Sequence, residues 1–167
     1  LLRKSGSVIM VNKVTVRGWD PEKKQEFLAE VKTAAELRSD QELEHFAQGI
    51  LLNDENINSI SIDEPGVHVS YSMPAKFLGI FNSSLSLRTD VDAEGRVKVN
   101  FPWYRFLFST SVDASAMQQE ISAKIDAVKA EINAKIDARV SADTDVTLEG
   151  TAQAIEAIVS INKVFHD

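Results

Sequence analysis

Apolar residues recur at every second position in several stretches of the chain, a period that predicts β-strands. The first stretch spans residues 8–17 and is rich in β-branched side chains, which strands favour. Further alternating stretches lie between residues 57 and 103, with turn-forming residues at 63–66 and 92–95. Pro74 predicts a strand end or an edge position, because proline donates no ladder hydrogen bond. We therefore expect a first strand followed by an antiparallel meander of about four strands.

The run of residues 101–108 is apolar on both faces of the strand that it is expected to form. Arg105 is its one charged residue, and Pro102 predicts an edge or a bulge at which the strand bends. A strand that is apolar on both faces is either covered on both sides or has one apolar face left for a partner. This run is therefore a candidate binding surface.

Apolar residues spaced by three and four positions predict two helices after the first strand. Asp20 and Pro21 suit the cap and the first position of a helix that extends to about residue 37. A capping box begins at Ser39 and precedes a second helix through about residue 50. Both helices are amphipathic and acidic.

The longest predicted helix covers residues 115–140, which contain no glycine or proline. Within it, the seven residues 121–127 recur eleven positions later at 132–138, and six of the seven are identical. Eleven residues make three turns at 3.67 residues per turn, so a repeated apolar position returns to nearly the same face. A polar connection at 142–147 precedes a short helix at 151–165, which is apolar nearly all round and is expected to be buried.

The repeat places an aliphatic stripe on the long helix, formed by Met117, Ile121, Ile125, Val128, Ile132, Ile136 and Val140. We expect this stripe to complete the domain core, as such stripes usually do. Two alternatives stay open. A second copy could pair with the stripe, which makes assembly candidates of Ile121, Ile125, Val128, Ile132 and Ile136. The helix could also lie on a lipid surface, with a lysine of each repeat beside the stripe.

The order of the predicted elements is β-α-α-β-β-β-β-α-α, which is typical of the α+β class. We expect an antiparallel sheet of about four to five strands with helices packed on one face. Residues 1–10 are interpreted as a leader or as the edge of a longer chain, and residues 11–110 as an α+β domain. Residues 111–167 form a helical C-terminal segment that we expect to pack on the same domain.

Composition disfavours several classes of function. The chain has 167 residues, of which 44% are hydrophobic and 26% are charged, as in an ordinary globular protein. The absence of cysteine excludes disulfides, thiolate zinc sites and a cysteine nucleophile. The net charge of −7 disfavours nucleic acid as a partner and, on average, anionic membranes. No apolar run is long enough to span a bilayer. The compartment stays open, with the cytoplasm favoured for a soluble chain.

The sequence contains no coherent catalytic or metal-binding motif. Residues 90–95 begin like a calcium loop, but the twelfth position is Phe101, where a bidentate Glu is required. The three histidines, His45, His68 and His166, are not spaced as metal ligands. We therefore expect a protein that is not an enzyme and that holds neither a metal nor a cofactor.

Eight of the twelve aromatic residues lie between residues 65 and 110, where the net charge is +2. The candidate ligand- or partner-binding residues are Phe77, Phe81, Trp103, Tyr104, Arg105 and Phe106. The leading hypothesis is a non-catalytic binding or assembly module, alone or within a larger chain, whose partner is a protein or a second copy. The alternative is a carrier that holds a lipid or another apolar small molecule between sheet and helix. The walls of its binding site would be Phe77, Phe81, Trp103 and Phe106.

Overall fold

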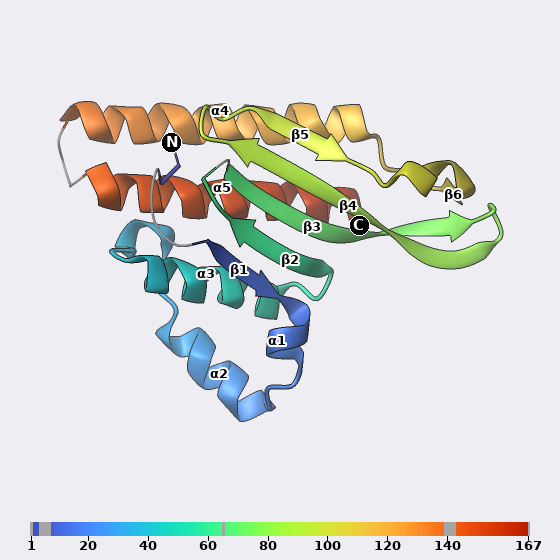
Figure 1. The fold of residues 1–167 in the computed structure, drawn as a ribbon, viewed down its shortest axis with the longest axis horizontal. Helices are drawn as coiled ribbons and strands as arrows, with labels where there is room; N and C mark the ends of the chain where they lie inside the picture. The colour runs from blue at the N-terminus through green and yellow to red at the C-terminus, as the bar shows by residue number, and fades with distance from the viewer. Residues whose placement is uncertain (1, 4–7, 65, 139–142, 167) are drawn as a thin grey trace.

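The structure is a computed structural model that describes residues 2–3, 8–64, 66–138 and 143–166. Across these residues it has the predicted α+β fold, with a six-stranded antiparallel sheet and five α-helices (Figure 1). The strands are β1 (Ile9–Asn12), β2 (Ile57–Ile62), β3 (Gly66–Phe77), β4 (Phe81–Asp92), β5 (Val97–Asn100) and β6 (Phe108–Ser109). The helices are α1 (Lys13–Arg17), α2 (Pro21–Glu30), α3 (Asp40–Asn53), α4 (Ala114–Ala138) and α5 (Asp143–His166), with the 3-10 helices η1 (Ala34–Glu36) and η2 (Trp103–Leu107).

The strands form a meander in the order β1-β2-β3-β4-β5, and every neighbouring pair is antiparallel. The longest pairing joins β3 and β4, from Gly66 opposite Asp92 to Phe77 opposite Phe81. In the β4–β5 turn, Gly95 has a φ of 86°, a conformation that glycine adopts without strain. The predicted meander is confirmed.

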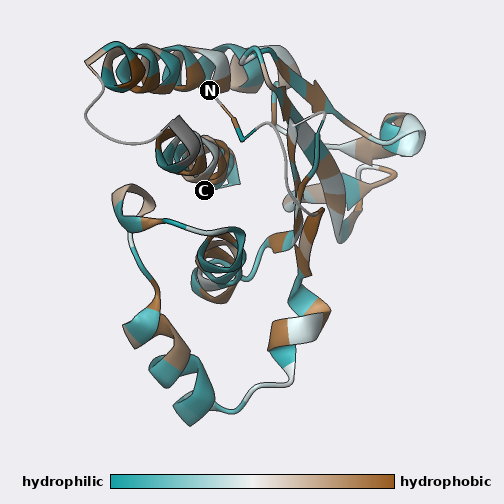
Figure 2. Ribbon diagram, turned by 60° about the vertical axis from the view of Figure 1, so that its left-hand side comes forward, coloured by the Kyte–Doolittle hydropathy of each residue, from teal (hydrophilic) through white to brown (hydrophobic). Residues whose placement is uncertain are grey.

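Helices α3, α4 and α5 cover one face of the sheet (Figure 2). The strand residues alternate accordingly: on β3, Val67, Val69 and Tyr71 are buried beneath the helices, whereas His68 and Ser70 are partly exposed on the other face. Because successive side chains of a strand point to opposite faces, the apolar half of each strand forms one core with the helices. The expected packing of helices on one face is confirmed.

The first predicted strand is shorter in the structure than the alternating pattern indicates. Strand β1 ends at Asn12, and residues 13–17 form helix α1 instead. The side-chain oxygen of Asn12 accepts a hydrogen bond from the Thr15 N–H at 3.1 Å, which caps the start of a helix. This local cap outweighs the β-branched composition of the segment, because β-propensity depends strongly on context.

The second predicted element, the helix expected over residues 20–37, is also shorter. Helix α2 ends at Glu30, and η1 follows after a break. After this break the Glu36 carboxylate accepts a hydrogen bond from the Thr33 N–H at 3.1 Å. Side chains that bond to nearby backbone groups compete with the regular helical pattern, so the expected helix is divided.

Residues 2 and 3 pack into the fold. Leu2 and Arg3 are both buried, and the Arg3 guanidinium lies 3.0 Å from the Asp40 carboxylate. The Arg3 backbone N–H donates a hydrogen bond to the Thr151 hydroxyl at 3.0 Å. These contacts join the segment to α3 and α5. The sequence suggests residues 1–10 as a leader or chain edge. In the structure they contribute three buried residues, of which the third, Ile9, starts β1, while residues 1 and 4–7 lie outside the described residues.

Helix α4 packs against α5 and β5 (Figures 1 and 2), and most of its described stripe residues are buried. Its bounds, Ala114–Ala138, agree with the helix predicted over residues 115–140. The assembly candidates Val128 and Ile136 are half-buried. The stripe residues that are buried are Met117, Ile121, Ile125 and Ile132. The stripe therefore completes the core, whereas its last member, Val140, lies outside the described residues.

The eleven-residue repeat gives α4 two equivalent contacts with α5. Lys124 donates a hydrogen bond to the Ser160 hydroxyl at 2.9 Å. Lys135, eleven residues further along α4, forms an ion pair with Glu149, which precedes Ser160 by the same interval. The two helices run antiparallel (Figure 1), so each repeat meets α5 in the same register. The repeat thus serves the packing of α4 on α5.

Replacing Lys135 with methionine is expected to lower the free energy of unfolding by about 1–3 kcal/mol at neutral pH. The reason is that the buried Glu149 loses its cation. The hydrogen bond to Glu149 raises the pKa of Lys135. The pair therefore stabilises the fold below the ordinary lysine pKa, and this contribution is lost as the pH rises through the raised value, above about 10.4. Urea unfolding at neutral pH and at about pH 11 measures both effects.

The matched control is Lys124→Met, because Lys124 occupies the equivalent position of the repeat but bonds to an uncharged hydroxyl. We expect it to change the free energy of unfolding by less than about 0.5 kcal/mol. Equal losses from the two variants would contradict the role assigned to the Lys135–Glu149 pair.

The last helix begins earlier than the sequence pattern indicates. Residues 143–147, expected in a polar connection, belong to α5. Val146 and Leu148 are buried in the core, so their packing outweighs the weak helix propensity of the aspartates and threonines around them. The expected burial of the following apolar residues is confirmed for Ala154, Ile155, Ile158 and Ile161, whereas Val164 near the end of the helix is exposed. No helix in the described part of the chain is long and apolar enough to cross a membrane.

Candidate functional site

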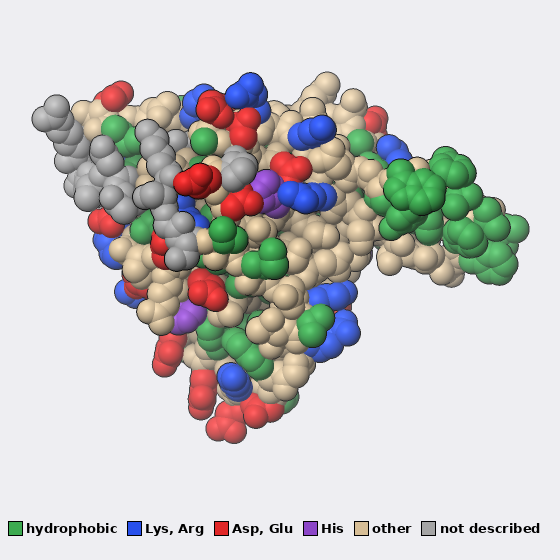
Figure 3. All heavy atoms as spheres, in the orientation of Figure 1, with side chains coloured by type: hydrophobic (Ala, Val, Ile, Leu, Met, Phe, Trp, Pro, Cys, Tyr) green, Lys and Arg blue, Asp and Glu red, His purple; other side chains and the backbone are tan. Residues whose placement is uncertain are grey.

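An arm, which we define as residues 74–84 and 101–111, projects from the sheet beyond the helical layer (Figures 1 and 3). It consists of the ends of β3 and β4 together with η2 and β6. Strand β6 pairs with the end of β3, where Phe108 lies opposite Phe77. The Leu78 N–H donates a hydrogen bond to the Leu107 carbonyl at 2.7 Å. Two segments that are distant in sequence therefore form one end of the molecule.

Pro74 marks the base of the arm and lies inside β3, not at the strand end that was one of its two predicted positions. Strand β2 pairs with β3 as far as Tyr71, and β6 pairs from Lys76 onward. Pro74 lies between these two partners, where its missing N–H interrupts no ladder. The other predicted position, a strand edge, is therefore confirmed for the short part of β3 around Pro74 that neither β2 nor β6 pairs with.

The aromatic run of the arm forms a 3-10 helix, so the strand predicted over residues 101–108 is wrong. Strand β5 ends at Asn100, and η2 follows Pro102, whose carbonyl accepts a hydrogen bond from the Arg105 N–H at 3.0 Å. Pro102 is the cap residue of η2, with a φ of −65° and an extended ψ of 155°, as cap residues have. In a 3-10 helix, residues i and i+3 share a face, so Trp103 and Phe106 lie on one side of η2.

A continuous series of ring contacts runs along the arm. The ring of Phe77 lies 5.4 Å from that of Phe108, which lies 6.0 Å from that of Tyr104. Trp103 follows at 5.6 Å from Tyr104 and 6.5 Å from Phe106. Centroid distances of about 4.5–7 Å are favourable for aromatic pairs. The half-buried Phe77 and Phe108 therefore support the rings at the end of the arm.

The end of the arm carries exposed apolar side chains that appear as a hydrophobic cluster in Figure 3. This cluster, the apolar tip, consists of Leu78, Ile80, Phe81, Trp103, Tyr104 and Phe106. The exposed fraction of these side chains ranges from 37% for Tyr104 to 82% for Trp103. Together they expose roughly 600–950 Å², if about 150–250 Å² is taken for each whole side chain. This area reaches or exceeds the upper end of the largest apolar patch on a typical monomer, roughly 300–600 Å².

Leu78 adopts a backbone conformation that disfavours leucine. Its φ is 53° in the turn between β3 and β4, in the left-handed region where glycine and asparagine are preferred. The conformation costs on the order of 1 kcal/mol for a branched apolar residue. Because Leu78 is also exposed, its side chain does not repay this cost within the core. Such a departure from local preference points to a function outside the fold.

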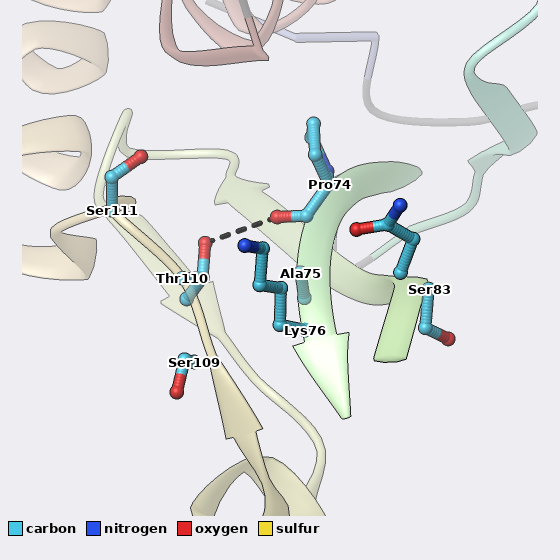
Figure 4. A pocket seen from close by; sticks show the side chains of 8 residues that line it. Pro74, Ala75, Lys76, Ser83, Ser109, Thr110 and Ser111 are labelled. Atoms are coloured by element: carbon cyan, nitrogen blue, oxygen red, sulfur yellow. Dashed lines mark hydrogen bonds between the residues drawn. The ribbon is translucent and has the colours of Figure 1, made fainter. Parts of the chain in front are cut away.

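An open hollow of about 470 Å³ lies behind the apolar tip (Figure 4). It is lined by Pro74, Ala75, Lys76, Asn82, Ser83, Ser109, Thr110 and Ser111. The Thr110 hydroxyl points toward the Pro74 carbonyl and donates a hydrogen bond to it at 3.3 Å. Most of the lining side chains are hydroxyl or amide groups, and Lys76 supplies the one formal charge. At its base the arm thus adds hydroxyl groups, an amide and the cation of Lys76 to a surface that is still largely apolar.

A polar network on the open face of the sheet is the main alternative site. The ring nitrogens of His68 lie 2.5 Å from the Asp90 carboxylate and 2.9 Å from the Asp63 carboxylate. Asp90 also accepts hydrogen bonds from Arg88 at 2.8 Å and from Asn100 at 3.0 Å. Because His68 and Asp90 are cross-strand neighbours, their pairing stabilises the sheet. These polar groups satisfy one another, an arrangement that fits a structural role.

The part of the chain that the structure describes holds no cluster of three or more His, Asp or Glu side chains that could bind a metal ion. Residues 90–95, which resemble the start of a calcium loop, end β4 and begin its turn to β5. There the Asp92 carboxylate accepts hydrogen bonds from the Glu94 and Arg96 N–H groups at 3.0 and 2.9 Å. The three histidines lie on different elements, α3, β3 and α5.

The residues selected from the sequence as a binding site lie together on the arm. Four belong to the apolar tip: Phe81, Trp103, Tyr104 and Phe106. Phe77 supports them, whereas the Arg105 guanidinium stacks 4.1 Å from the Phe101 ring and reaches the Val112 carbonyl at 3.5 Å. Sequence reasoning missed Leu78 and Ile80. The available signal was a short turn around Gly79 with apolar residues on both sides.

Comparison with known proteins identifies no relative, since no family model, curated protein or solved structure matches the chain. The function must therefore be inferred from the surface of the molecule. Its most distinctive surface feature is the apolar tip on the arm.

Proposed function

We propose that this chain is a non-catalytic binding or assembly module that docks through the apolar tip. The observation that carries this proposal is the exposure of six apolar side chains at the end of a projecting arm. Apolar patches of this size on soluble domains mark interaction sites. Trp and Tyr are suited to such sites, because each has a large apolar body and a polar group that can stay in water.

The construction of the arm supports the same function. Backbone pairing of β6 with β3 and the ring contacts of Phe77 and Phe108 hold the apolar tip in one arrangement. A surface that is ordered before it binds loses less conformational entropy on docking. The strained Leu78 adds to the argument, because more than half of this residue lies outside the fold in a conformation that leucine disfavours.

The two other candidate surfaces receive less support. The α4 residues Ile121, Ile125 and Ile132 are packed in the core, so association through them requires the fold to open. A carrier needs its apolar walls between sheet and helix, but Phe81 and Trp103 are exposed on the arm. The apolar tip is available without any rearrangement, which favours docking through the arm.

Substitution at the apolar tip tests the proposed function. The double variant Leu78→Asn with Phe106→Ser is expected to shorten retention on a hydrophobic-interaction column. Its free energy of unfolding in urea should stay within about 0.5 kcal/mol of the original value or rise, because both side chains are exposed and asparagine tolerates the left-handed conformation.

The control double variant is Val14→Ser with Val164→Ser, which removes two exposed apolar side chains outside the arm. It should change retention far less than the variant at the apolar tip does. The proposal is contradicted if both double variants reduce retention equally. It is also contradicted if the variant at the tip loses several kcal/mol of stability, as a core substitution does.

A further inference from the structure

The arm differs from the rest of the chain in its charge. Residues 74–84 and 101–111 contain two cations, Lys76 and Arg105, and no Asp or Glu, although the net charge of the chain is −7. Lys76 is exposed beside the hollow behind the apolar tip. The carboxylates lie over the body of the molecule instead (Figure 3). The arm is therefore the part of the surface that an anionic partner can approach without repulsion.

The chemical groups of the arm also follow an order along its length. The apolar tip is at the end and includes Trp103 and Tyr104. Hydroxyl and amide side chains line the hollow behind it, together with Lys76 (Figure 4). Proteins at a lipid–water interface carry the same kinds of groups, with apolar and aromatic side chains at the acyl boundary and cations beside the phosphates.

We infer that the apolar tip inserts into the surface of a lipid bilayer that contains anionic headgroups, with the exposed Lys76 beside the headgroup phosphates. This inference rests on the proposed docking function and names its partner. The chain then attaches to the membrane surface as a peripheral protein. Repulsion between anionic headgroups and the acidic body keeps the body away from the bilayer and orients the arm toward it.

A second copy of the chain fits the apolar tip less well than a bilayer does. A symmetric contact between two tips leaves the cations of the arm without an opposite charge, because the arm of the second copy contains no Asp or Glu. The arm also protrudes from the molecule (Figure 3). A fluid bilayer accommodates a protrusion without a matching groove, whereas a protein partner must supply one.

Binding to lipid vesicles tests this inference. The substitution Trp19→Phe leaves Trp103 as the single tryptophan, so a blue shift of its fluorescence reports insertion of the apolar tip. We expect a shift with phosphatidylcholine vesicles and tighter binding when about 30% of the lipid is phosphatidylglycerol. Added salt should reduce the difference between the two kinds of vesicle, because it screens the charge contribution.

Variants in the Trp19→Phe background separate the apolar contribution from the charge contribution. Leu78→Asn with Phe106→Ser is expected to weaken binding to both kinds of vesicle at least tenfold. Lys76→Glu changes the charge by two units, so we expect about 25-fold weaker binding to anionic vesicles, at roughly fivefold per charge, and unchanged binding to neutral ones. Lys23→Glu makes the same change on α2, away from the arm (Figure 1), and should leave both affinities nearly unchanged.

Absence of a blue shift with both kinds of vesicle overturns the inference. Equal weakening by Lys76→Glu and Lys23→Glu overturns it too, because the arm then has no special role. If vesicles are not bound but retention on the hydrophobic column still depends on Leu78 and Phe106, the docking function stands and its partner is a protein. If retention does not depend on these residues either, the docking function itself is wrong.

Discussion

Replacing Ile125 with aspartate is expected to unfold the protein, with a loss of at least about 5 kcal/mol of stability. Ile125 is fully buried in the core, so the variant loses about 1.5–3 kcal/mol of apolar burial. The unpaired carboxylate that replaces it costs several kcal/mol more. This loss removes all or a large part of the roughly 5–15 kcal/mol by which a domain is stable, so native circular dichroism should disappear either without denaturant or at a much lower urea concentration than in the unsubstituted protein.

The control is Ala123→Asp, which places the same side chain on the exposed side of α4 and should cost about 1 kcal/mol or less. The comparison also distinguishes the two roles considered for the aliphatic stripe of α4, packing in the core and pairing with a second copy.

If Ile125→Asp stays folded but loses a self-association that light scattering detects in the unsubstituted protein, the stripe is an assembly surface. Unfolding of Ile125→Asp alone supports its role in the core.

Gly66→Ala is expected to have the second largest effect, a loss of about 4 kcal/mol of stability. Gly66 begins β3 with a φ of 152°, which side chains rarely tolerate. A Cβ atom there would lie 1.9 Å from the Val91 carbonyl oxygen on the paired strand. Because this neighbour is backbone, the clash can be relieved only by separating β3 from β4. Urea unfolding measures the loss.

Gly18→Ala is the matched control, because a Cβ atom at Gly18 has no neighbour within 4 Å and its φ is −78°. Alanine there should leave stability unchanged or raise it by about 0.4–1 kcal/mol, through a smaller entropy of the unfolded chain. If Gly66→Ala is no more destabilising than Gly18→Ala, the close approach of β3 and β4 at this point is not required by the fold.

Local patterns in the sequence were sufficient for the regular elements of the fold. The period of two predicts the paired strands, and the uninterrupted period of 3.6 over residues 115–140 predicts α4, observed at Ala114–Ala138. The errors lie where a few nearby side chains decide the backbone conformation. Asn12 caps a helix where alternation indicates a strand, and Thr33 and Glu36 interrupt a helix.

The composition of the candidate site was also visible in the sequence, but its geometry was not. Trp103, Tyr104 and Phe106 were selected because they are aromatic and clustered. Their exposure depends on the 3-10 helix after Pro102, and their link to Phe77 through Phe108 depends on the pairing of β6 with β3. The hydropathy pattern does not predict that Leu78 belongs to the apolar tip. Its exposure there depends on its position in the β3–β4 turn and on its left-handed backbone conformation.

The sequence by itself therefore determined the class of fold, the meander, the long helix and the identity of most residues in the apolar tip. Each of these depends on the spacing of side chains along one segment, which backbone geometry converts directly into a face or a turn. Only the tertiary structure decided which apolar residues the core uses and which it leaves exposed. That choice depends on contacts between segments that are distant in sequence. Helix α5 and strand β5 pack against α4 and cover its stripe. The arm extends past the helices, so its aromatic end stays exposed.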